Sequence, residues 1–184
     1  MMGKLIAFAL SAMAAVAGLL LLTHKKKVSD EIDGGVRRLE DTNAPKVIGS
    51  KDITSFFCRL STLDICMEDS PVAGEVYTFK ADADVAWCKR RNRPDETEGK
   101  SFLPDGDFFC RLQQIVSEYD LAKYNGIHYS VSGLPPDFGA ELKIEYASGE
   151  YISASNNQCC FLPLGAAEAL VTLFKQYYEN SGGD

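Results

Sequence analysis

Thiol catalysis is the first chemistry that the residue types of this chain allow. His128 is a candidate base, and Cys110 or Cys160 is a candidate thiolate that it would activate. The same histidine stands between Ile127 and Tyr129, and in a strand it would occupy the polar face opposite to them. The sequence therefore favours a structural histidine, with a thiol–histidine enzyme as the alternative.

Other catalytic and metal-binding patterns are absent from the sequence. It contains no G-x-S-x-G nucleophile motif, no P-loop, no dinucleotide-binding glycine motif and no H-E-x-x-H. Asp82 and Asp84 share the polar face of one predicted strand and could bind a cation together, although such pairs are more common on a solvated face. We therefore predict no catalytic, cofactor-binding or metal-binding residue and no cofactor.

The chain has six cysteines and no C-x-x-C pair, the spacing typical of a metal or redox motif. In a reducing compartment all six would be free thiols, whereas an exported domain would form up to three disulfides. Cys88 and Cys110 are the first pair that we would expect to bridge, because they flank the segment 89–106. The six are Cys58, Cys66, Cys88, Cys110, Cys159 and Cys160.

The charge of the chain argues against nucleic acid as a partner. Its 184 residues include 19 Lys and Arg but 26 Asp and Glu, for a net charge of −7, whereas binding phosphates needs a basic face. One basic cluster, Lys89–Arg93, is interpreted as a solvated loop from strand to helix, with docking of phosphates or acidic partners as the alternative. The segments 133–139 and 148–157 are further candidates for contacts with a partner.

The N-terminal region is predicted to anchor the chain in a membrane. The sequence from Leu5 to Thr23 has no charged residue, and as a helix it would span roughly 28 Å, close to the ~30 Å hydrocarbon core of a bilayer. A cleaved signal peptide is the alternative, but it would have a shorter apolar run followed by a small-residue cleavage site. We predict an anchor in residues 1–27, a linker in 28–46 and a folded domain in 47–184.

The predicted anchor implies a single-pass protein of the cell membrane, with the membrane bound through residues 5–23. Three lysines, Lys25–Lys27, follow the apolar run and only Lys4 precedes it, which favours a cytoplasmic domain. The difference is one charge once the amino terminus is counted, so an extracytoplasmic domain is the alternative.

Alternation of apolar and polar residues predicts an antiparallel sheet. The longest alternating run, residues 75–88, places Tyr77, Phe79 and Trp87 on one face, so we expect Trp87 to be buried beneath a helix. The predicted strands are residues 53–63, 75–88, 127–132, 142–146 and 151–154, the last two forming a hairpin.

Two amphipathic helices are predicted to cover this sheet. The first is capped by Asp107, carries an apolar stripe from Phe108 to Tyr119, and ends before Gly126. The second begins near Pro163. The element order predicts an α+β fold: an antiparallel sheet of four or five strands with two packed helices, preceded by one transmembrane helix.

Four segments in the second half carry a resemblance to a known family. They are Tyr124–Gly126, Val131–Gly139, Tyr146–Ala154 and Asn157–Pro163. Over roughly residues 120–180 the chain resembles a family of uncharacterised bacterial proteins that are membrane-anchored or lipoprotein-like. The chain lacks the cysteine of a lipoprotein signal, and the resemblance implies no activity for any residue.

Two functions are compatible with the sequence. The first is a non-catalytic interaction or binding domain whose sheet face or 133–139 loop contacts a protein or a cell-surface ligand. The second is an enzyme with a dispersed thiol/His or carboxylate site. A pocket enclosing His128 with a cysteine or carboxylate would favour the enzyme, and an open sheet face without one would favour the binding domain. The binding domain is preferred, because every usual catalytic spacing is missing.

Overall fold

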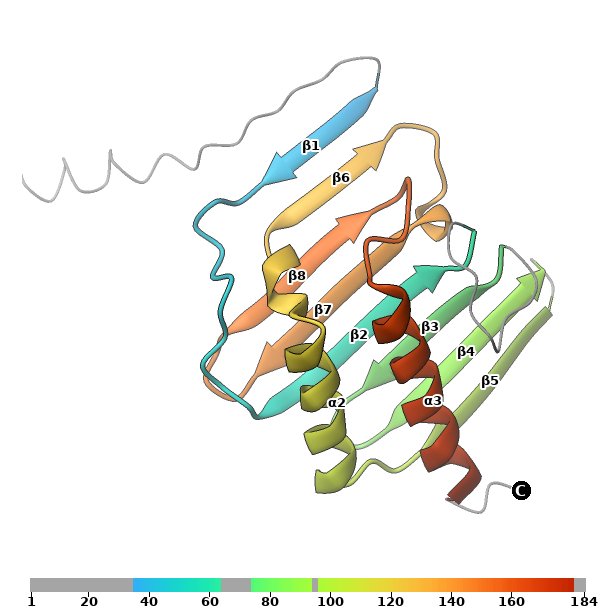
Figure 1. The fold of residues 1–184 in the computed structure, drawn as a ribbon. Helices are drawn as coiled ribbons and strands as arrows, with labels where there is room; N and C mark the ends of the chain where they lie inside the picture. Colours follow the sequence, from blue (N-terminus) through green and yellow to red (C-terminus); the bar gives the residue numbers. More distant parts are fainter. Residues whose placement is uncertain (1–34, 64–73, 94–95, 181–184) are drawn as a thin grey trace, which may run out of the picture.

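The structure is a computed structural model that describes residues 35–63, 74–93 and 96–180. In these residues an eight-stranded sheet forms one layer and two α-helices lie across one of its faces (Figure 1). The strands are β1 (Val36–Glu40), β2 (Ile53–Ser61), β3 (Val76–Ala81), β4 (Ala86–Arg93), β5 (Glu96–Phe102), β6 (Ile127–Val131), β7 (Ala140–Tyr146) and β8 (Tyr151–Asn156). The helices are α2 (Gly106–Glu118) and α3 (Leu164–Asn180), with short 3-10 helices η1 (Leu121–Tyr124) and η2 (Pro136–Phe138).

The strand order across the sheet is β1-β6-β8-β7-β2-β3-β4-β5. Every neighbouring pair is antiparallel except β6 and β8, which are parallel. Strands β2 to β5 form a meander of sequential neighbours, and the later strands join it where β7 pairs with β2. Strands β2 to β5 therefore pair with their neighbours in sequence, whereas the other half of the sheet includes pairs of strands that are far apart in the chain.

The sheet is larger than the four or five strands predicted from the sequence. The run 75–88 contains a turn between β3 and β4, in which the Asp82 carboxylate accepts hydrogen bonds from the N–H groups of Asp84 and Val85 at 3.1 Å. Strand β1 lies in the predicted linker 28–46, and β5 follows the cluster predicted as a loop. Both are edge strands without the alternating apolar face that marks a half-buried strand.

Trp87 lies on the opposite sheet face from the one predicted. Ala81 pairs with Ala86 across the turn, so the alternation changes phase and Trp87 comes into register with Lys80. The Trp87 side chain is half-buried on the face without helices. The prediction that Trp87 is buried beneath a helix is therefore wrong.

The predicted transmembrane helix is also corrected. Within residues 35–63, 74–93 and 96–180, no helix has the length and apolar character needed to cross a membrane. The predicted anchor Leu5–Thr23 lies outside the described residues. The fold class is α+β with an eight-stranded sheet and two helices, and the single-pass membrane location is not retained.

The two helices use the apolar stripes that the sequence predicts. The N-cap of α2 is Asp105 rather than Asp107, because the Asp105 carboxylate accepts a hydrogen bond from the N–H of Phe108 at 2.8 Å. Its buried face includes Phe108, Leu112, Ile115 and Val116. Helix α3 buries Ala166, Ala167, Leu170, Val171, Leu173 and Phe174. Both stripes pack against the same sheet face, and no α-helix of the described residues lies over the other face (Figure 1).

A buried asparagine ties the segment between β1 and β2 to the sheet. The Asn125 side chain is fully buried, and its Nδ2 donates to the carbonyl oxygens of Pro45 at 3.0 Å and Tyr151 at 2.9 Å. Its Oδ1 accepts from the N–H of Ser153 at 2.8 Å. One buried amide therefore pairs with three backbone groups from separate segments of the chain.

We expect Asn125→Ala to lower the free energy of unfolding by about 2–3 kcal/mol, because a buried side chain loses three hydrogen bonds to backbone groups. Urea denaturation followed by circular dichroism measures this change. Asn43→Ala is the matched control, since the Asn43 side chain is exposed and its loss should cost less than about 0.5 kcal/mol. Equal stability of the two variants would contradict this role for Asn125.

Candidate functional site

The structure separates the predicted thiol and histidine. His128 in β6 pairs with Ser155 in β8, and its Nδ1 lies 2.9 Å from the Ser155 Oγ. Burial, and then the charge of Lys143, hold the pKa of His128 below its usual value. The side chain beside His128 is thus the hydroxyl of Ser155 rather than a thiol. The lowered pKa favours the neutral form of the imidazole ring.

Cys110 and Cys160 lie on the helix side of the sheet. Cys110 is exposed on α2, and Cys160 packs against the core near Cys58. Burial, and then the nearby Cys160, raise the pKa of the Cys58 thiol well above its usual value. His128 faces the other side, so neither cysteine can use it as a base.

Five cysteines fall within the described residues, and no disulfide joins any two of them. Cys88 is half-buried on β4, whereas Cys110 is exposed on α2, and the two are not bridged. Cys66 lies outside the described residues. The disulfide that we would expect first in an exported domain is therefore not formed here.

The two aspartates considered as a cation site belong to the turn between β3 and β4. Asp82 forms an ion pair with Lys80 at 3.1 Å, and this contact with the two backbone N–H groups holds its pKa below the usual value. Asp84 is exposed in the same turn. Across the described part of the chain, no group of three or more His, Cys, Asp or Glu side chains could hold a metal ion.

The basic cluster Lys89–Arg93 is part of strand β4, not a loop. Successive side chains in a strand point to opposite faces. Lys89 and Arg91 therefore lie on the bare face of the sheet, and Arg90 lies on the face that the helices cover. The basic residues of this one segment are thus divided between the two faces of the sheet.

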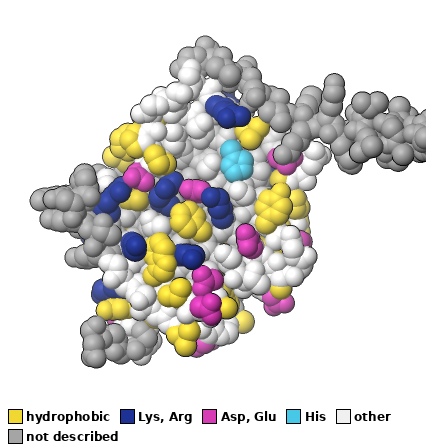
Figure 2. All heavy atoms as spheres, turned by 180° about the vertical axis from the view of Figure 1, so that it is seen from behind, with side chains coloured by type: hydrophobic (Ala, Val, Ile, Leu, Met, Phe, Trp, Pro, Cys, Tyr) yellow, Lys and Arg dark blue, Asp and Glu magenta, His cyan; other side chains and the backbone are white. Residues whose placement is uncertain are grey.

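A row of alternating lysines and aromatic rings crosses the bare face. Lys143, Phe57, Lys80 and Trp87 are neighbours in register on β7, β2, β3 and β4. Lys89 follows Trp87 on the same face, with its Nζ 4.8 Å from the centroid of the Trp87 ring. We name these five residues the basic–aromatic patch. Figure 2 shows Lys and Arg side chains interleaved with hydrophobic ones on this face.

The lysines of the patch remain accessible although two of them form ion pairs. Lys143 pairs with Glu141 at 2.6 Å and its side chain is 59% exposed, and Lys80 is 42% exposed beside Asp82. Lys143 also lies 5.7 Å from the centroid of the Phe57 ring. Within the described residues Lys89 contacts Trp87 and has no carboxylate partner. Surface ion pairs of this kind are weak, so a ligand can replace them.

The predicted contact loop 133–139 is held against the same face by its own aspartate. Asp137 forms an ion pair with Arg91, and its other oxygen lies 3.8 Å from the Nε of Arg59. Arg59 also pairs with Glu141 at 2.8 Å. These arginines are thus occupied by internal carboxylates, which leaves the lysines of the patch as the cations that a partner can reach.

The segment 148–157 also has an internal role. Glu150 accepts hydrogen bonds from the N–H groups of Gly49 and Ser50 at 2.9 Å and from the Ser148 hydroxyl at 2.8 Å. These bonds hold the pKa of Glu150 below its usual value. The β7–β8 turn thereby fixes the chain that leads into β2, while Tyr151 stays 50% exposed.

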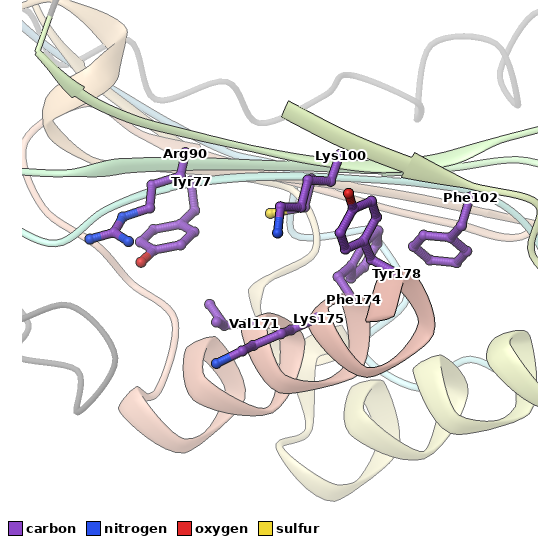
Figure 3. Close-up of a pocket in the computed structure, with 9 residues that line it drawn as sticks. Tyr77, Arg90, Lys100, Phe102, Val171, Phe174, Lys175 and Tyr178 are labelled. Atoms are coloured by element: carbon purple, nitrogen blue, oxygen red, sulfur yellow. The ribbon is translucent and has the colours of Figure 1, made fainter. Parts of the chain in front are cut away.

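A cavity of about 220 Å³ lies on the helix side of the sheet, between α3 and strands β3, β4 and β5 (Figure 3). It does not include His128. This cavity therefore gives no support to the thiol–histidine enzyme.

Comparisons with protein-family models, with curated proteins and with solved structures give no match for this chain. The resemblance over residues 120–180 stays a prediction.

Sequence reasoning missed both the patch and the cavity for one reason. Both need Lys89–Arg93 to be a strand, and the cluster was interpreted as a loop because acidic residues and Pro94 follow it. The available signal was the alternation that begins at Ala86, which places basic residues on both faces of a strand.

Proposed function

We propose that this chain is a non-catalytic binding domain that holds an acidic segment of a protein partner on the basic–aromatic patch. The observation that supports this proposal is the row of Lys143, Phe57, Lys80 and Trp87 on a sheet face that neither helix covers. Aromatic side chains supply contact area at protein interfaces, and cations beside them select for carboxylates. The thiol–histidine alternative loses its basis, because the two groups face opposite sides of the sheet.

The net charge of the chain supports an acidic partner at this place. With a net charge of −7, most of the protein repels an acidic peptide. The patch is a local region of opposite sign, so electrostatics would direct an acidic segment to it and away from the rest of the surface.

The sheet geometry gives the spacing that the partner should have. Adjacent strands lie ~4.8 Å apart, and Lys143 and Lys80 are separated by one strand, so they stand about 10 Å apart. A peptide in the polyproline II conformation rises about 3.1 Å per residue with three residues per turn, so side chains three positions apart lie on one face and about 9 Å apart. The best ligand therefore carries an acidic residue at every third position, with apolar residues between them facing Phe57 and Trp87.

A labelled peptide of repeated Glu-Ser-Leu units tests this proposal on the full chain. We expect binding by fluorescence anisotropy, together with a change in the emission of Trp87, which is the single tryptophan of the protein. The affinity should fall as the salt concentration rises, because the contacts are at the surface. A Gln-Ser-Leu peptide of the same length is the matched neutral probe and should bind far more weakly.

Charge-removing variants identify the surface. Lys80→Gln and Lys143→Gln should each weaken the Glu peptide up to about fivefold, and together about twentyfold, as expected for exposed ion pairs. Lys175→Gln is the matched control, because it removes the same charge from α3 on the other side of the sheet. The proposal fails if the control weakens binding as much as the patch variants, or if the Gln peptide binds equally well.

A further inference from the structure

The cavity on the helix side is a second site, independent of the patch. Side chains from three strands and from α3 enclose its volume of about 220 Å³ (Figure 3). They are Tyr77, Cys88, Arg90, Lys100 and Phe102 from the sheet, and Val171, Phe174, Lys175 and Tyr178 from the helix. These described lining residues therefore combine apolar surface with three cations and include no carboxylate.

The three cations reach the cavity from different elements. Lys100 on β5 pairs with Cys88 on β4, and Arg90 follows Cys88 by two residues on the same face. Arg90 and Lys100 are therefore diagonal neighbours, with their Cβ atoms about 7 Å apart. In Figure 3 the ammonium group of Lys100 points from the sheet toward α3, and Lys175 lies on the helix opposite. Lys100 and Lys175 therefore reach one cavity from opposite sides.

Arg90 is held in place by a carboxylate that is itself almost fully buried. Glu75 has a side chain only 1% exposed, and its Oε1 lies 2.5 Å from the Arg90 guanidinium. The Tyr77 hydroxyl donates to the other oxygen of Glu75 at 3.4 Å. Glu75 neutralises one of the three cations, which leaves the cavity with a positive excess.

The remaining lining groups favour a flat apolar body. Lys100 lies 4.3 Å from the centroid of the Tyr178 ring, and the Phe102 ring stands 5.9 Å from that of Phe174. Cys88 adds a neutral thiol, because burial raises its pKa to about 12. The thiol therefore supplies neither a negative charge nor a nucleophile, and the site is built for binding.

We propose that this cavity binds a small organic anion that consists of a carboxylate on a single aromatic ring. An apolar cavity of about 150 Å³ is enough for a benzene ring, so the volume here accommodates such a ring with its carboxylate. The ring packs against Phe102, Phe174 and Tyr178, and the carboxylate lies between Lys100 and Lys175.

Titration of the full chain with benzoate, followed by proton–nitrogen correlation spectra, tests this site. We expect a dissociation constant on the order of 1 mM for so small a ligand, with shifts at the backbone groups of β4, β5 and α3. Benzamide has the same shape without the charge, and benzylamine has the opposite charge. Both should bind at least about tenfold more weakly, since only the carboxylate gains charge-assisted contacts.

Two substitutions and one control assign the contacts. Lys100→Met and Lys175→Met keep the apolar stem, and each should weaken benzoate about tenfold while the fold is unchanged. Lys89→Met is the control, because it removes the same charge from the other face of β4 and should leave benzoate binding as it is. Equal affinity for benzoate and benzamide, or shifts confined to residues outside the cavity, would overturn the assignment.

This experiment separates the cavity from the patch. Lys89 and Trp87 belong to the proposed protein-binding surface, and Lys100 and Lys175 belong to the cavity. If the Glu peptide binds and benzoate does not, the proposed cavity site fails and the proposed patch stands. If benzoate binds and the Glu peptide does not, the patch fails and the cavity site stands.

Discussion

Replacing Gly139 with alanine is expected to prevent the native sheet from forming. A Cβ atom at this position would lie 1.8 Å from the carbonyl oxygen of Asn156 and 2.9 Å from that of Cys159. Both are backbone atoms, and Asn156 pairs with Ala140 in the β7–β8 ladder, so the Asn156 carbonyl cannot move away without breaking that ladder. We expect a loss of more than about 4 kcal/mol, at the upper end for single substitutions.

Gly106→Ala is the matched control for this substitution. A Cβ atom at Gly106 would meet nothing within 4 Å, and the residue is the first of helix α2, where alanine is favoured over glycine. Urea denaturation should show Gly106→Ala unchanged or slightly more stable, while Gly139→Ala is unfolded or aggregated. A Gly139→Ala variant with the stability of the parent would show that β7 and β8 do not approach each other as described.

The second large effect is expected at Phe174, which lies at the centre of the core. Its ring stands 5.0–6.4 Å, between centroids, from the rings of Phe56, Phe79, Phe102 and Phe108. These belong to β2, β3, β5 and α2, so one side chain joins the sheet to both helices. Phe174→Ala should lower the free energy of unfolding by about 3–5 kcal/mol, through lost contacts and a cavity that cannot close.

Phe138→Ala provides the comparison for Phe174→Ala. Phe138 is 39% exposed in η2, and its truncation should cost less than about 1 kcal/mol. Both variants are measured by urea denaturation with circular dichroism. Similar losses for the two would mean that α3 is not packed at Phe174.

The parts of the fold that the sequence predicts are those with an apolar pattern of their own. The β7–β8 hairpin, β2 and β6 lie where the alternation indicates, and α2 and α3 bury the predicted stripes. Strands β1 and β5 have no such pattern, because an edge strand is stabilised by backbone pairing with one neighbour and little by side-chain burial. Their existence depends on partners far away or in a hairpin, which local residues do not specify.

The candidate sites were not predictable for a related reason. A change of phase at the turn Asp82–Val85 decides which face Trp87 and Lys89 occupy, and the alternating run from residue 75 hides that turn. The cavity needs side chains from β3, β4, β5 and α3, and only tertiary packing brings them together. The alternation of β4 itself was readable, and with it the division of the basic cluster between two faces.

The pairing of β2 with β7 also determines when the protein can finish folding during its synthesis. Arg59 and Glu141, which meet across that pair, are 82 positions apart, and a ribosome delivers β2 to β5 long before β7. Until β7 is synthesised, the backbone N–H and C=O groups on the β7 side of β2 have no partner strand. An unpaired strand edge of this kind is prone to pair with another chain. Translation speed through the segment between β5 and β7 thus controls how long each growing chain is exposed to aggregation.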